Sequence, residues 1–317
     1  MKALLAFPTL EAVVARAQKS FTLVRSGGGA LGVDEIAQLA NEHQVDALFV
    51  APRNPVRAEL IQKLPATVKV ISTFSVGFDH IDVAAAKAKG IAVTNTPEVL
   101  SEATANLAFL LLLAASRRLP EAEALMRQGW GRHLGTQDLL GVDLTGKTLA
   151  IFGMGRIGRE MADRARAFGM KIVYCNRNRL HPDLEKGAAY FANFKEMLPL
   201  ADALSLHAPG TNETKELMNR ETFALMKKGS IFVNTARGSL VNEDALIEAL
   251  RTGHLFAAGL DVFTREPTLD PRFLELQNVV LAPHVGSATI ETRTKMGFLM
   301  VENAEAVLDG GKPANIL

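Results

Sequence analysis

Short apolar runs alternate with amphipathic stretches through the first hundred residues. Strand-like runs lie at residues 2–7, 21–25, 46–51, 68–73 and 91–95. Between them, segments such as 33–43 and 80–90 carry apolar residues at helical spacing. Alternation of strands and helices predicts a parallel sheet with helices on both faces.

A second alternation begins near residue 147 and gives strand-like runs at residues 147–153, 171–176, 201–208, 230–236, 256–262 and 279–283. After it, residues 289–311 form one helical pattern that ends at Gly310 or Gly311, because glycine commonly closes a helix. These patterns predict an α/β chain of two domains. One is residues 99–284, and the other is discontinuous and combines residues 1–98 with residues 285–317.

An apolar helix and a polar segment join the two alternations. The helix is predicted to begin at Ser101, a suitable N-cap, and to run to about Arg118, since Pro120 blocks its continuation. Its middle is apolar nearly all round, which indicates that both sides are buried in an interdomain or intersubunit position. The polar connection that follows, residues 120–146, holds Trp130, the only tryptophan.

Composition narrows the class of protein. The 317 residues are 48% apolar and 22% charged, and 35 lysines and arginines nearly balance 34 aspartates and glutamates. No net field therefore favours nucleic acid or an anionic membrane as a partner. The longest apolar run, residues 107–115, is shorter than the roughly 20 residues that span a bilayer. Cys175 is the only cysteine, so an internal disulfide is excluded and the expected location is the reducing cytoplasm.

A glycine-rich turn lies inside a complete strand–turn–helix–strand unit. It reads Gly153-Met154-Gly155-Arg156-Ile157-Gly158, after one strand run and before a helical pattern and the next strand run. In a dinucleotide-binding unit the first glycine permits a tight turn, the second admits the pyrophosphate and the third lets helix and strand pack closely. N–H groups of the first helical turn then face the phosphates. The alternative is an ordinary glycine turn, but the surrounding pattern favours a dinucleotide site.

The end of the next strand carries no acidic residue. Dinucleotide sites normally place Asp or Glu there to bind ribose hydroxyls, whereas this chain has Asn176, followed by Arg177, Asn178 and Arg179. An amide does not repel a 2′-phosphate, and arginines pair with phosphate through charge-assisted hydrogen bonds. The pattern therefore predicts NADP(H), with NAD(H) as the weaker alternative. In the other interpretation, the two arginines belong to a solvated surface loop.

Three residues suited to hydride chemistry follow strand runs of the second alternation. Arg237 suits a carboxylate and a ketone oxygen, and His284 suits proton delivery to a developing alkoxide. Glu266 suits the orientation and charge balance of that histidine. Taken singly, each has an ordinary structural explanation, as a salt-bridge partner, a surface acid or a satisfied histidine. All three lie at carboxyl ends of strands, where open α/β sheets bind ligands.

Extended motifs carry a family resemblance across nearly the whole chain. The motifs occupy residues 72–97, 153–158, 206–214, 234–246, 259–267 and 281–289. They resemble the signatures of the D-isomer-specific 2-hydroxyacid dehydrogenases. The resemblance implies a flavodoxin-like substrate domain, an NAD(P)-binding Rossmann domain and an active-site cleft between them. It also implies that Arg237, Glu266 and His284 are the catalytic set, with His284 as acid/base, and it implies a homodimer.

Substrate and cofactor contacts follow from the same resemblance. The expected substrate contacts are Val76, Gly77, Arg237, His284 and Trp130, with backbone amides around Val76 and Gly77 holding the carboxylate. Trp130 either reaches the partner's active site or packs the dimer. No metal site is expected. The expected cofactor contacts are Thr104, Gly153, Met154, Gly155, Arg156, Ile157, Gly158, Asn176, Arg177, Asn178, Arg179, His207, Ala208, Pro209, Thr211, Thr235, Ala236, Arg237, Asp261, His284 and Gly286.

Residues 99–130 are similar to the glyoxylate/hydroxypyruvate reductase branch of the family, apart from Asn106, where relatives often carry an acid. The predicted function is NADPH-dependent reduction of small 2-oxo acids, glyoxylate and hydroxypyruvate first. The alternatives are an enzyme for a bulkier 2-oxo or 2-hydroxy acid, such as an aryl-pyruvate, and a nucleotide-sensing, co-repressor-like binding protein. Fold alone does not decide among them.

Overall fold

The computed structural model describes residues 1–25 and 28–317, which form two compact units. The first unit comprises Met1–Leu100 and Ser287–Leu317, and the second comprises Ser101–Gly286. Each contains one all-parallel sheet, which confirms the predicted α/β class with two parallel-sheet domains. The expected division lay two residues earlier at each boundary, and the roles assigned to the two domains stay predictions.

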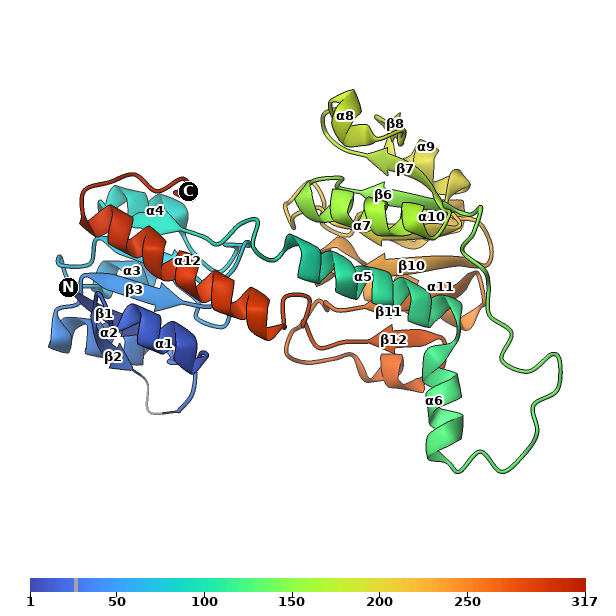
Figure 1. Ribbon diagram of the computed structural model, residues 1–317, viewed down its shortest axis with the longest axis horizontal. Helices are drawn as coiled ribbons and strands as arrows, with labels where there is room; N and C mark the ends of the chain where they lie inside the picture. Colours follow the sequence, from blue (N-terminus) through green and yellow to red (C-terminus); the bar gives the residue numbers. More distant parts are fainter. Residues whose placement is uncertain (26–27) are drawn as a thin grey trace. The chain divides into compact units, whose positions relative to one another are not determined.

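The first unit contains a five-stranded sheet in the order β2-β1-β3-β4-β5 (Figure 1). Its strands are β1 (Lys2–Leu5), β2 (Thr22–Arg25), β3 (Ala47–Val50), β4 (Val70–Thr73) and β5 (Ala92–Thr94). Every strand lies within a predicted apolar run. The order is that of the flavodoxin-like doubly wound sheets.

Helices cover both faces of this sheet because successive strand side chains point to opposite sides. Leu4 packs on one face and Leu5 on the other. The face of Leu4 is covered by α2 (Val33–His43), α3 (Ala58–Lys63) and α4 (Val83–Ala88), and the face of Leu5 by α1 (Glu11–Ala17) and α12 (Ile290–Leu308). The cores on both sides are aliphatic and aromatic, as expected of strands buried on both faces.

The last helix, α12, joins the first unit, as the sequence pattern predicts. It lies beside α1 in Figure 1 and packs on β4. Gly297 permits this approach, since a side chain there would overlap Val13. Arg16 of α1 forms a bidentate ion pair with Glu305 of α12, with both N–O distances at 2.7 Å. The C-terminal segment is therefore an integral part of this unit.

The second unit contains a seven-stranded sheet in the order β12-β11-β10-β9-β6-β7-β8. Its strands are β6 (Thr148–Phe152), β7 (Lys171–Cys175), β8 (Ala189–Phe191), β9 (Ala203–Leu206), β10 (Ser230–Asn234), β11 (Leu255–Leu260) and β12 (Val279–Leu281). Counting from β6, the order is the Rossmann order with one more strand at the β12 edge. The short strand β8 was not among the predicted runs.

Two hydrophobic layers flank this sheet. The remaining helices are α5 (Ser101–Ser116), α6 (Leu119–Arg127), α7 (Arg156–Ala167), α8 (Pro182–Glu185), α9 (Phe194–Met197), α10 (Arg220–Leu225) and α11 (Glu243–Arg251), with short 3-10 turns at η1 (Leu198–Leu200), η2 (Gly238–Leu240) and η3 (Pro271–Glu275). Helices α5 and α7 pack on one face, and α9, α10 and α11 on the other. Gly259 of β11 lets α5 lie directly on the sheet, since a Cβ there would be 2.7 Å from Leu111 Cβ.

One expectation about the helical connection is corrected. Leu110 of α5 is 54% exposed in the single chain, so burial of both sides of this helix stays a prediction that requires the intersubunit position. Residues 120–146 are not simply a connection, because α6 occupies Leu119–Arg127. Pro120 does end the first helix, but it then sits in the first turn of α6, where its missing N–H costs no hydrogen bond. Arg118 makes the break with a left-handed φ of 52°.

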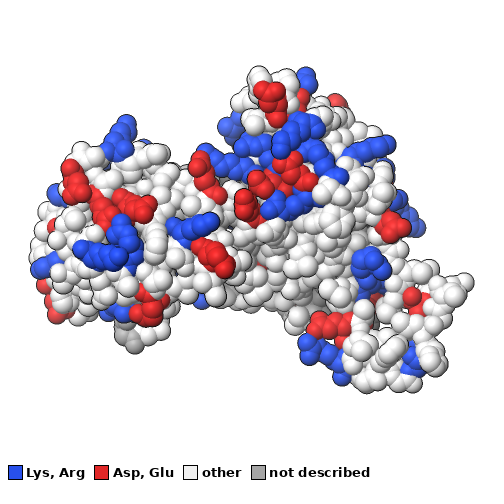
Figure 2. Space-filling view, viewed as in Figure 1, with Lys and Arg blue, Asp and Glu red and all other residues white. Residues whose placement is uncertain are grey.

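Charged side chains of both signs share the surface of the protein, and Figure 2 shows them interspersed on the visible face. No helix among the described residues is long and apolar enough to cross a membrane. Within the same residues, no group of three His, Cys, Asp or Glu side chains is arranged to hold a metal ion. Cys175 is buried as a free thiol.

Candidate active site

The carboxyl ends of the parallel strands in the second unit bring the predicted site segments to one edge. Phe152 pairs with Leu206, Leu206 with Asn234, and Asn234 with Leu260. Leu260 pairs in turn with Leu281 of β12. The residues that follow these positions therefore line the edge in register: the glycine turn after β6, His207 after β9, Thr235 after β10 and Asp261 after β11.

The glycine turn has the geometry that its three glycines predict. Gly153 has φ +90°, and a Cβ there would lie 2.6 Å from the Ala208 nitrogen. A Cβ on Gly158 would lie 2.5 Å from the Gly153 carbonyl oxygen, so this glycine keeps α7 against β6. Gly155 is the N-cap of α7 and faces open space, with nothing within 4 Å of an added Cβ.

This turn suits a dinucleotide phosphate. The N-cap residue of the twelve-residue helix α7 is Gly155, which has no side chain to cap the first turn, and such a helix end favours an anion. A second polar group fits a ligand at the same edge, because the buried Thr235 hydroxyl has no hydrogen-bond partner within the described part of the chain. Buried polar groups usually have partners, so this hydroxyl is available to one that the cofactor supplies.

Asn176 occupies the end of β7 and turns its side chain toward the glycine turn. Its Oδ1 accepts a 2.6 Å hydrogen bond from the Met154 N–H. The side chain therefore supports the turn while presenting a neutral amide where an acid is usual. Asn178, two residues further on, is exposed.

The two arginines after β7 differ in their surroundings. Arg179 pairs at 2.8 Å with Glu185, a buried carboxylate that also accepts a 2.6 Å hydrogen bond from the Tyr174 hydroxyl. The Arg179 and Tyr174 hydrogen bonds lower the pKa of Glu185 to about 2. Arg177 instead makes a 3.3 Å pair with Glu213, and both side chains are about four-fifths exposed, at 81% and 78%. Arg179 is thus held by a structural partner, whereas Arg177 has only a solvent-exposed one.

Polar residues further along the edge form a second cluster. The buried Asp261 accepts hydrogen bonds from the N–H groups of Val285 and Gly286, at 2.7 and 2.8 Å. Burial raises the pKa of Asp261. A Cβ on Gly286 would lie 3.2 Å from Asp261 Oδ2 and 3.3 Å from Thr104 Cγ2, so these three predicted cofactor contacts meet.

His207 lies at the same edge in a desolvated position. Its Nε2 lies 2.8 Å from the Ser205 hydroxyl. Burial lowers the pKa of His207 to about 4, so the imidazole is neutral at pH 7. Ala208 and Pro209 follow it and continue the predicted cofactor segment to Thr211.

His284 and Glu266 form a close side-chain pair. His284 Nδ1–H donates to Glu266 Oε2 at 2.6 Å, and Glu266 Oε1 accepts from the Phe263 N–H at 2.9 Å. Burial alone would raise the pKa of Glu266, but the His284 and Phe263 hydrogen bonds lower it overall. The His284 side chain is 45% exposed, so Nε2, the ring nitrogen opposite the glutamate, can face a ligand.

Arg237 belongs to the same neighbourhood. It precedes the short turn η2 and donates from Nη1 to the Ala236 carbonyl at 2.7 Å. Its charge contributes to the lowered pKa of Glu266, which places the guanidinium within electrostatic reach of the pair. Arg237, Glu266 and His284 come from three separate strand ends, so the fold of the second unit assembles them.

Two predicted substrate contacts lie in the first unit. Val76 and Gly77 follow β4, and their carbonyls accept hydrogen bonds from Asn95 Nδ2 at 2.8 Å and from Ser75 Oγ at 2.6 Å. These two hydrogen bonds hold the loop through its carbonyl groups. Trp130 is not among the residues gathered at the sheet edge. It follows α6, its side chain is 49% exposed, and its backbone N–H donates to the Leu125 carbonyl.

Sequence reasoning missed three residues that shape this edge. Glu213 pairs with Arg177, Glu185 holds Arg179, and Gly238 lies against the backbone of Phe263 and Thr264. Each acts through a partner distant in sequence or on a different element, so local pattern carried no signal for it.

Comparisons with known proteins place the chain beside reductases and dehydrogenases. Residues 109–286 match the model of the D-isomer specific 2-hydroxyacid dehydrogenase NAD-binding domain. A glyoxylate reductase of Thermococcus litoralis is 44% identical over 283 residues, covering 88% of this chain and 85% of that one. The 4-methyl-2-oxopentanoate reductase A of Aspergillus oryzae is 42% identical over 287 residues, covering 88% of this chain and 86% of that one.

A solved structure extends the likeness over the whole chain. The NADPH-dependent glyoxylate/hydroxypyruvate reductase of Sinorhizobium meliloti, in complex with NADP and malonate, has a TM-score of 0.88 at 34% identity. The match covers 100% of this chain and 96% of that one. The similarity therefore spans both units.

Proposed function

The chain belongs to the D-isomer-specific 2-hydroxyacid dehydrogenase family, and from this premise we propose that it reduces small 2-oxo acids to 2-hydroxy acids with NADPH. It is an oxidoreductase with a nicotinamide cofactor. Glyoxylate and hydroxypyruvate are the first candidate substrates. The observation that carries the proposal is the His284–Glu266 pair beside Arg237, on the sheet edge that holds the glycine turn.

The proposed chemistry divides among the three side chains. Arg237 binds the substrate carboxylate and polarises the ketone oxygen, since its planar fork presents several N–H donors. The bound reduced nicotinamide supplies the hydride that adds to the ketone carbon. His284 donates the proton on Nε2 to the oxygen that gains the negative charge. Glu266 holds Nδ1–H, which fixes the ring orientation and stabilises the imidazolium before the transfer.

The cofactor is held by the turn and the strand ends described above. The α7 N-terminus binds the pyrophosphate, and the Thr235 hydroxyl with Asp261 and Thr104 serves the nicotinamide end. Val76 and Gly77 contribute amides to the substrate carboxylate. The remaining predicted contacts, Ala236, Ile157 and Arg156, flank these groups in the chain.

NADPH is preferred in this proposal because β7 is followed by a neutral residue, where an acid is usual, and then by basic residues. Asn176 brings no charge that repels a 2′-phosphate, and Arg177 lies next to it with an exposed partner. Arg179 contributes less directly, since Glu185 already occupies its guanidinium. The preference therefore rests mainly on Asn176 and Arg177.

Steady-state kinetics with glyoxylate test the function. Turnover should be higher at low cofactor concentration with NADPH than with NADH, and His284→Ala should lose roughly a hundredfold or more of kcat. NADPH binding, followed by fluorescence, should change little because the α7 turn is untouched. Equal use of NADH contradicts the cofactor preference, and unchanged turnover in His284→Ala contradicts the acid/base role.

A bulkier substrate is the second candidate. The relative named 4-methyl-2-oxopentanoate reductase is nearly as similar to this chain as the glyoxylate reductase is, at 42% against 44% identity. A panel of 2-oxo acids of increasing side-chain size, assayed with NADPH, separates the two. A kcat/KM that rises from glyoxylate to a branched or aryl side chain would replace the first candidate by the second.

A further inference from the structure

The segment that carries Glu266 lies against the residue that follows Arg237. Gly238 has no room for a side chain, because an added Cβ would overlap the carbonyl group of Phe263 and the nitrogen of Thr264. The Phe263–Thr264 peptide therefore packs directly on the η2 backbone. This close approach fixes the start of the Glu266 segment relative to Arg237.

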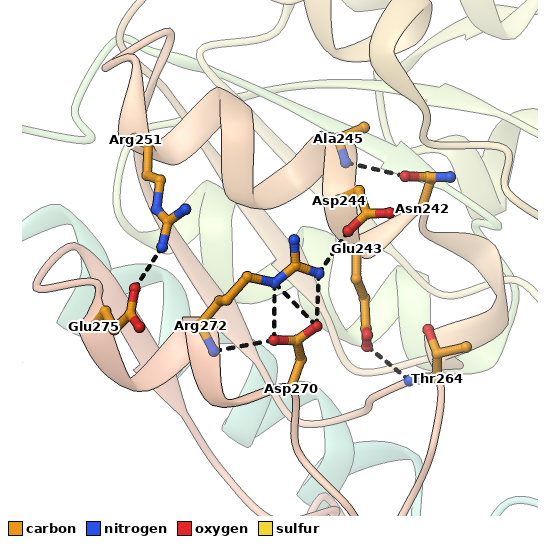
Figure 3. Close-up of polar contacts among 9 residues, drawn as sticks. All are labelled: Asn242, Glu243, Asp244, Ala245, Arg251, Thr264, Asp270, Arg272 and Glu275. Atoms are coloured by element: carbon orange, nitrogen blue, oxygen red, sulfur yellow. Dashed lines mark hydrogen bonds and ion pairs between the residues drawn. The ribbon is translucent and has the colours of Figure 1, made fainter.

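A carboxylate from α11 holds the same peptide. Glu243 Oε1 accepts a 2.8 Å hydrogen bond from the Thr264 N–H (Figure 3). The preceding N–H, that of Phe263, donates to Glu266 Oε1 at 2.9 Å. Two consecutive amides are thus bound by two carboxylates, one from α11 and one that also accepts from His284.

The far end of the segment is fixed to the same turn of α11. Arg272 binds Asp270 through Nε at 3.0 Å and Nη2 at 2.7 Å, and reaches Asp244 at 2.5 Å (Figure 3). The Arg272 hydrogen bond lowers the pKa of Asp270 to about 2, so this link is ionised at neutral pH. Glu243 therefore binds the near end of the 262–270 segment, while Asp244 is one of two α11 links near its far end, the other being Arg251 to Glu275.

A simpler role for Glu243, as a helix-terminal acid, does not account for its geometry. Acids in a first turn stabilise the positive end of a helix. The N-terminus of α11 is already capped by Asn242, which accepts from the Ala245 N–H at 3.0 Å, and Asp244 also lies in the first turn. Yet the Glu243 carboxylate binds an amide of another segment.

We propose that Glu243 is a positioning residue for the proton-donating pair. By holding the Phe263–Thr264 peptide on Gly238, it sets the place of the Glu266 carboxylate and so the orientation of the His284 ring. The inference rests on the proposed function, because it assigns Glu243 an effect on the reduction step. In this proposal Glu243 acts through the Thr264 amide that it binds.

Three variants of the full-length chain test this role. Glu243→Ala removes the acceptor, Glu243→Gln keeps an oxygen acceptor, and Asp244→Ala is the matched control from the same turn. Misplacement of a catalytic group by a fraction of an ångström to one ångström lowers turnover roughly ten- to a hundredfold, and this is expected of Glu243→Ala in kcat with glyoxylate. The KM for NADPH should stay within about twofold, since the α7 turn is untouched.

The other two variants separate positioning from general damage. Glu243→Gln should recover most of the lost turnover, because its amide oxygen accepts the Thr264 N–H. Asp244→Ala should keep nearly the wild-type kcat, because Asp244 binds Arg272 and not the Phe263–Thr264 peptide, and Arg251 of α11 still pairs with Glu275 beyond the far end of the segment. A Glu243→Ala variant with unchanged kcat, or a Glu243→Gln variant as impaired as Glu243→Ala, would overturn the proposal.

Hydrogen exchange gives a readout that needs no substrate. The amide hydrogens of residues 263–266 should exchange faster in Glu243→Ala than in the wild type. In Asp244→Ala their exchange rates should equal those of the wild type. Unchanged exchange in Glu243→Ala overturns the inference. If the wild-type chain reduced none of the 2-oxo acids, the proposed function would fail, and the exchange comparison would then decide the inference alone.

Discussion

His284 is held in a backbone conformation that non-glycine residues seldom adopt. Its φ is +55°, and its N–H donates to the Asp261 carbonyl at 2.8 Å. The ring is bound at Nδ1 by Glu266. These contacts to the backbone and to the ring hold His284 in a strained backbone conformation. Residues held in strained conformations concentrate at functional sites. The position of Nε2 therefore follows from two partners that the sequence alone could only suggest.

The Glu266 carboxylate predicts how pH affects reduction. The groups that face it are His284, Arg237 and Asp261. Its pKa is lowered in the folded protein. The stabilising interaction of the ionised carboxylate is therefore fully present above the ordinary glutamate pKa, and it is lost as pH falls through the lowered pKa of the folded state. Across the neutral range the carboxylate is ionised and favours the imidazolium.

Glu266→Gln should therefore reduce kcat where the wild-type carboxylate is ionised, which includes the neutral range, and reduce it least at acidic pH where that carboxylate is protonated. The neutral amide keeps a polar partner for Nδ1–H but no longer stabilises the positive charge. The measurement is kcat against pH for wild type and variant at saturating NADPH. A variant whose profile overlays that of the wild type would show that the charge of Glu266 has no part in the reaction.

Removal of the Glu213 charge should strengthen the preference for NADPH over NADH. It pairs with Arg177, and both side chains are largely exposed. Glu213→Gln should leave Arg177 to a 2′-phosphate and raise the NADPH-over-NADH ratio of kcat/KM, by less than about fivefold, because exposed ion pairs are weak. Arg177→Ala should move the ratio the opposite way, and Lys215→Gln, two residues along the chain, serves as the control. A ratio that falls in Glu213→Gln contradicts the assignment.

At the scale of elements, apolar runs predicted eleven of the twelve strands, all but β8. Most of these strands are buried and bounded by turn residues, so their pattern is local, and the partly exposed β2 still carries an apolar pair at Leu23 and Val24. Strand β8 is only Ala189–Phe191, and its short apolar run, residues 188–192, was not singled out as a strand. Helix α6 was missed because Pro120 stops one helix and begins another, and sequence does not distinguish the two roles without the fold.

The candidate site was predictable where chemistry follows a strand directly. Gly153, Arg237 and His284 each come at or just after a strand end, so strand prediction also placed them. Glu243 and Gly238 escaped, because their importance lies in contacts with a segment more than twenty residues away. Such contacts depend on how elements pack, and no local period encodes them.

Substitution of two glycines in the turn between β6 and α7 should have different effects on stability and NADPH affinity. Gly158→Ala should lower both the melting temperature and the NADPH affinity, because its Cβ would meet the Gly153 carbonyl at 2.5 Å and force α7 from β6. Gly155→Ala should leave the melting temperature nearly unchanged, because an added Cβ finds open space, while weakening NADPH binding. Thermal unfolding without cofactor and fluorescence titration with NADPH measure the two effects. Equal NADPH affinity in Gly155→Ala and wild type would contradict a pyrophosphate at this turn.

At the scale of the whole molecule, α6 and the segment after it present apolar side chains to solvent. In Figure 1 this part of the chain leads away from the sheet of its unit. Five large apolar side chains between residues 119 and 140 are 41–59% exposed: Leu119, Met126, Trp130, Leu134 and Leu140. Apolar groups concentrated on one segment are typical of an interface. We therefore expect a second copy of the chain to cover this segment.

Light scattering after size exclusion tests the dimer, with an expected mass of twice the 34.2 kDa of one chain. Leu119→Asp should lower that mass toward the monomer, because a charge buried in an interface lacks a partner. Leu274→Asp is the control, since Leu274 is 70% exposed but lies in η3, outside the segment. A wild-type monomer at micromolar concentration, or equal dissociation by both variants, would contradict the assignment.

Trp130→Ala then separates the two roles open to this side chain. If the indole reaches the active site of the partner, the KM for glyoxylate rises while the mass stays that of a dimer. If it packs the interface, the variant dimer dissociates at a higher protein concentration than the wild-type dimer. The KM for glyoxylate then changes only at concentrations where the measured mass falls. Because Trp130 lies in the exposed segment and not at the sheet edge of its own chain, an effect on substrate without loss of mass requires the partner's site. Unchanged mass and unchanged KM would remove Trp130 from both roles.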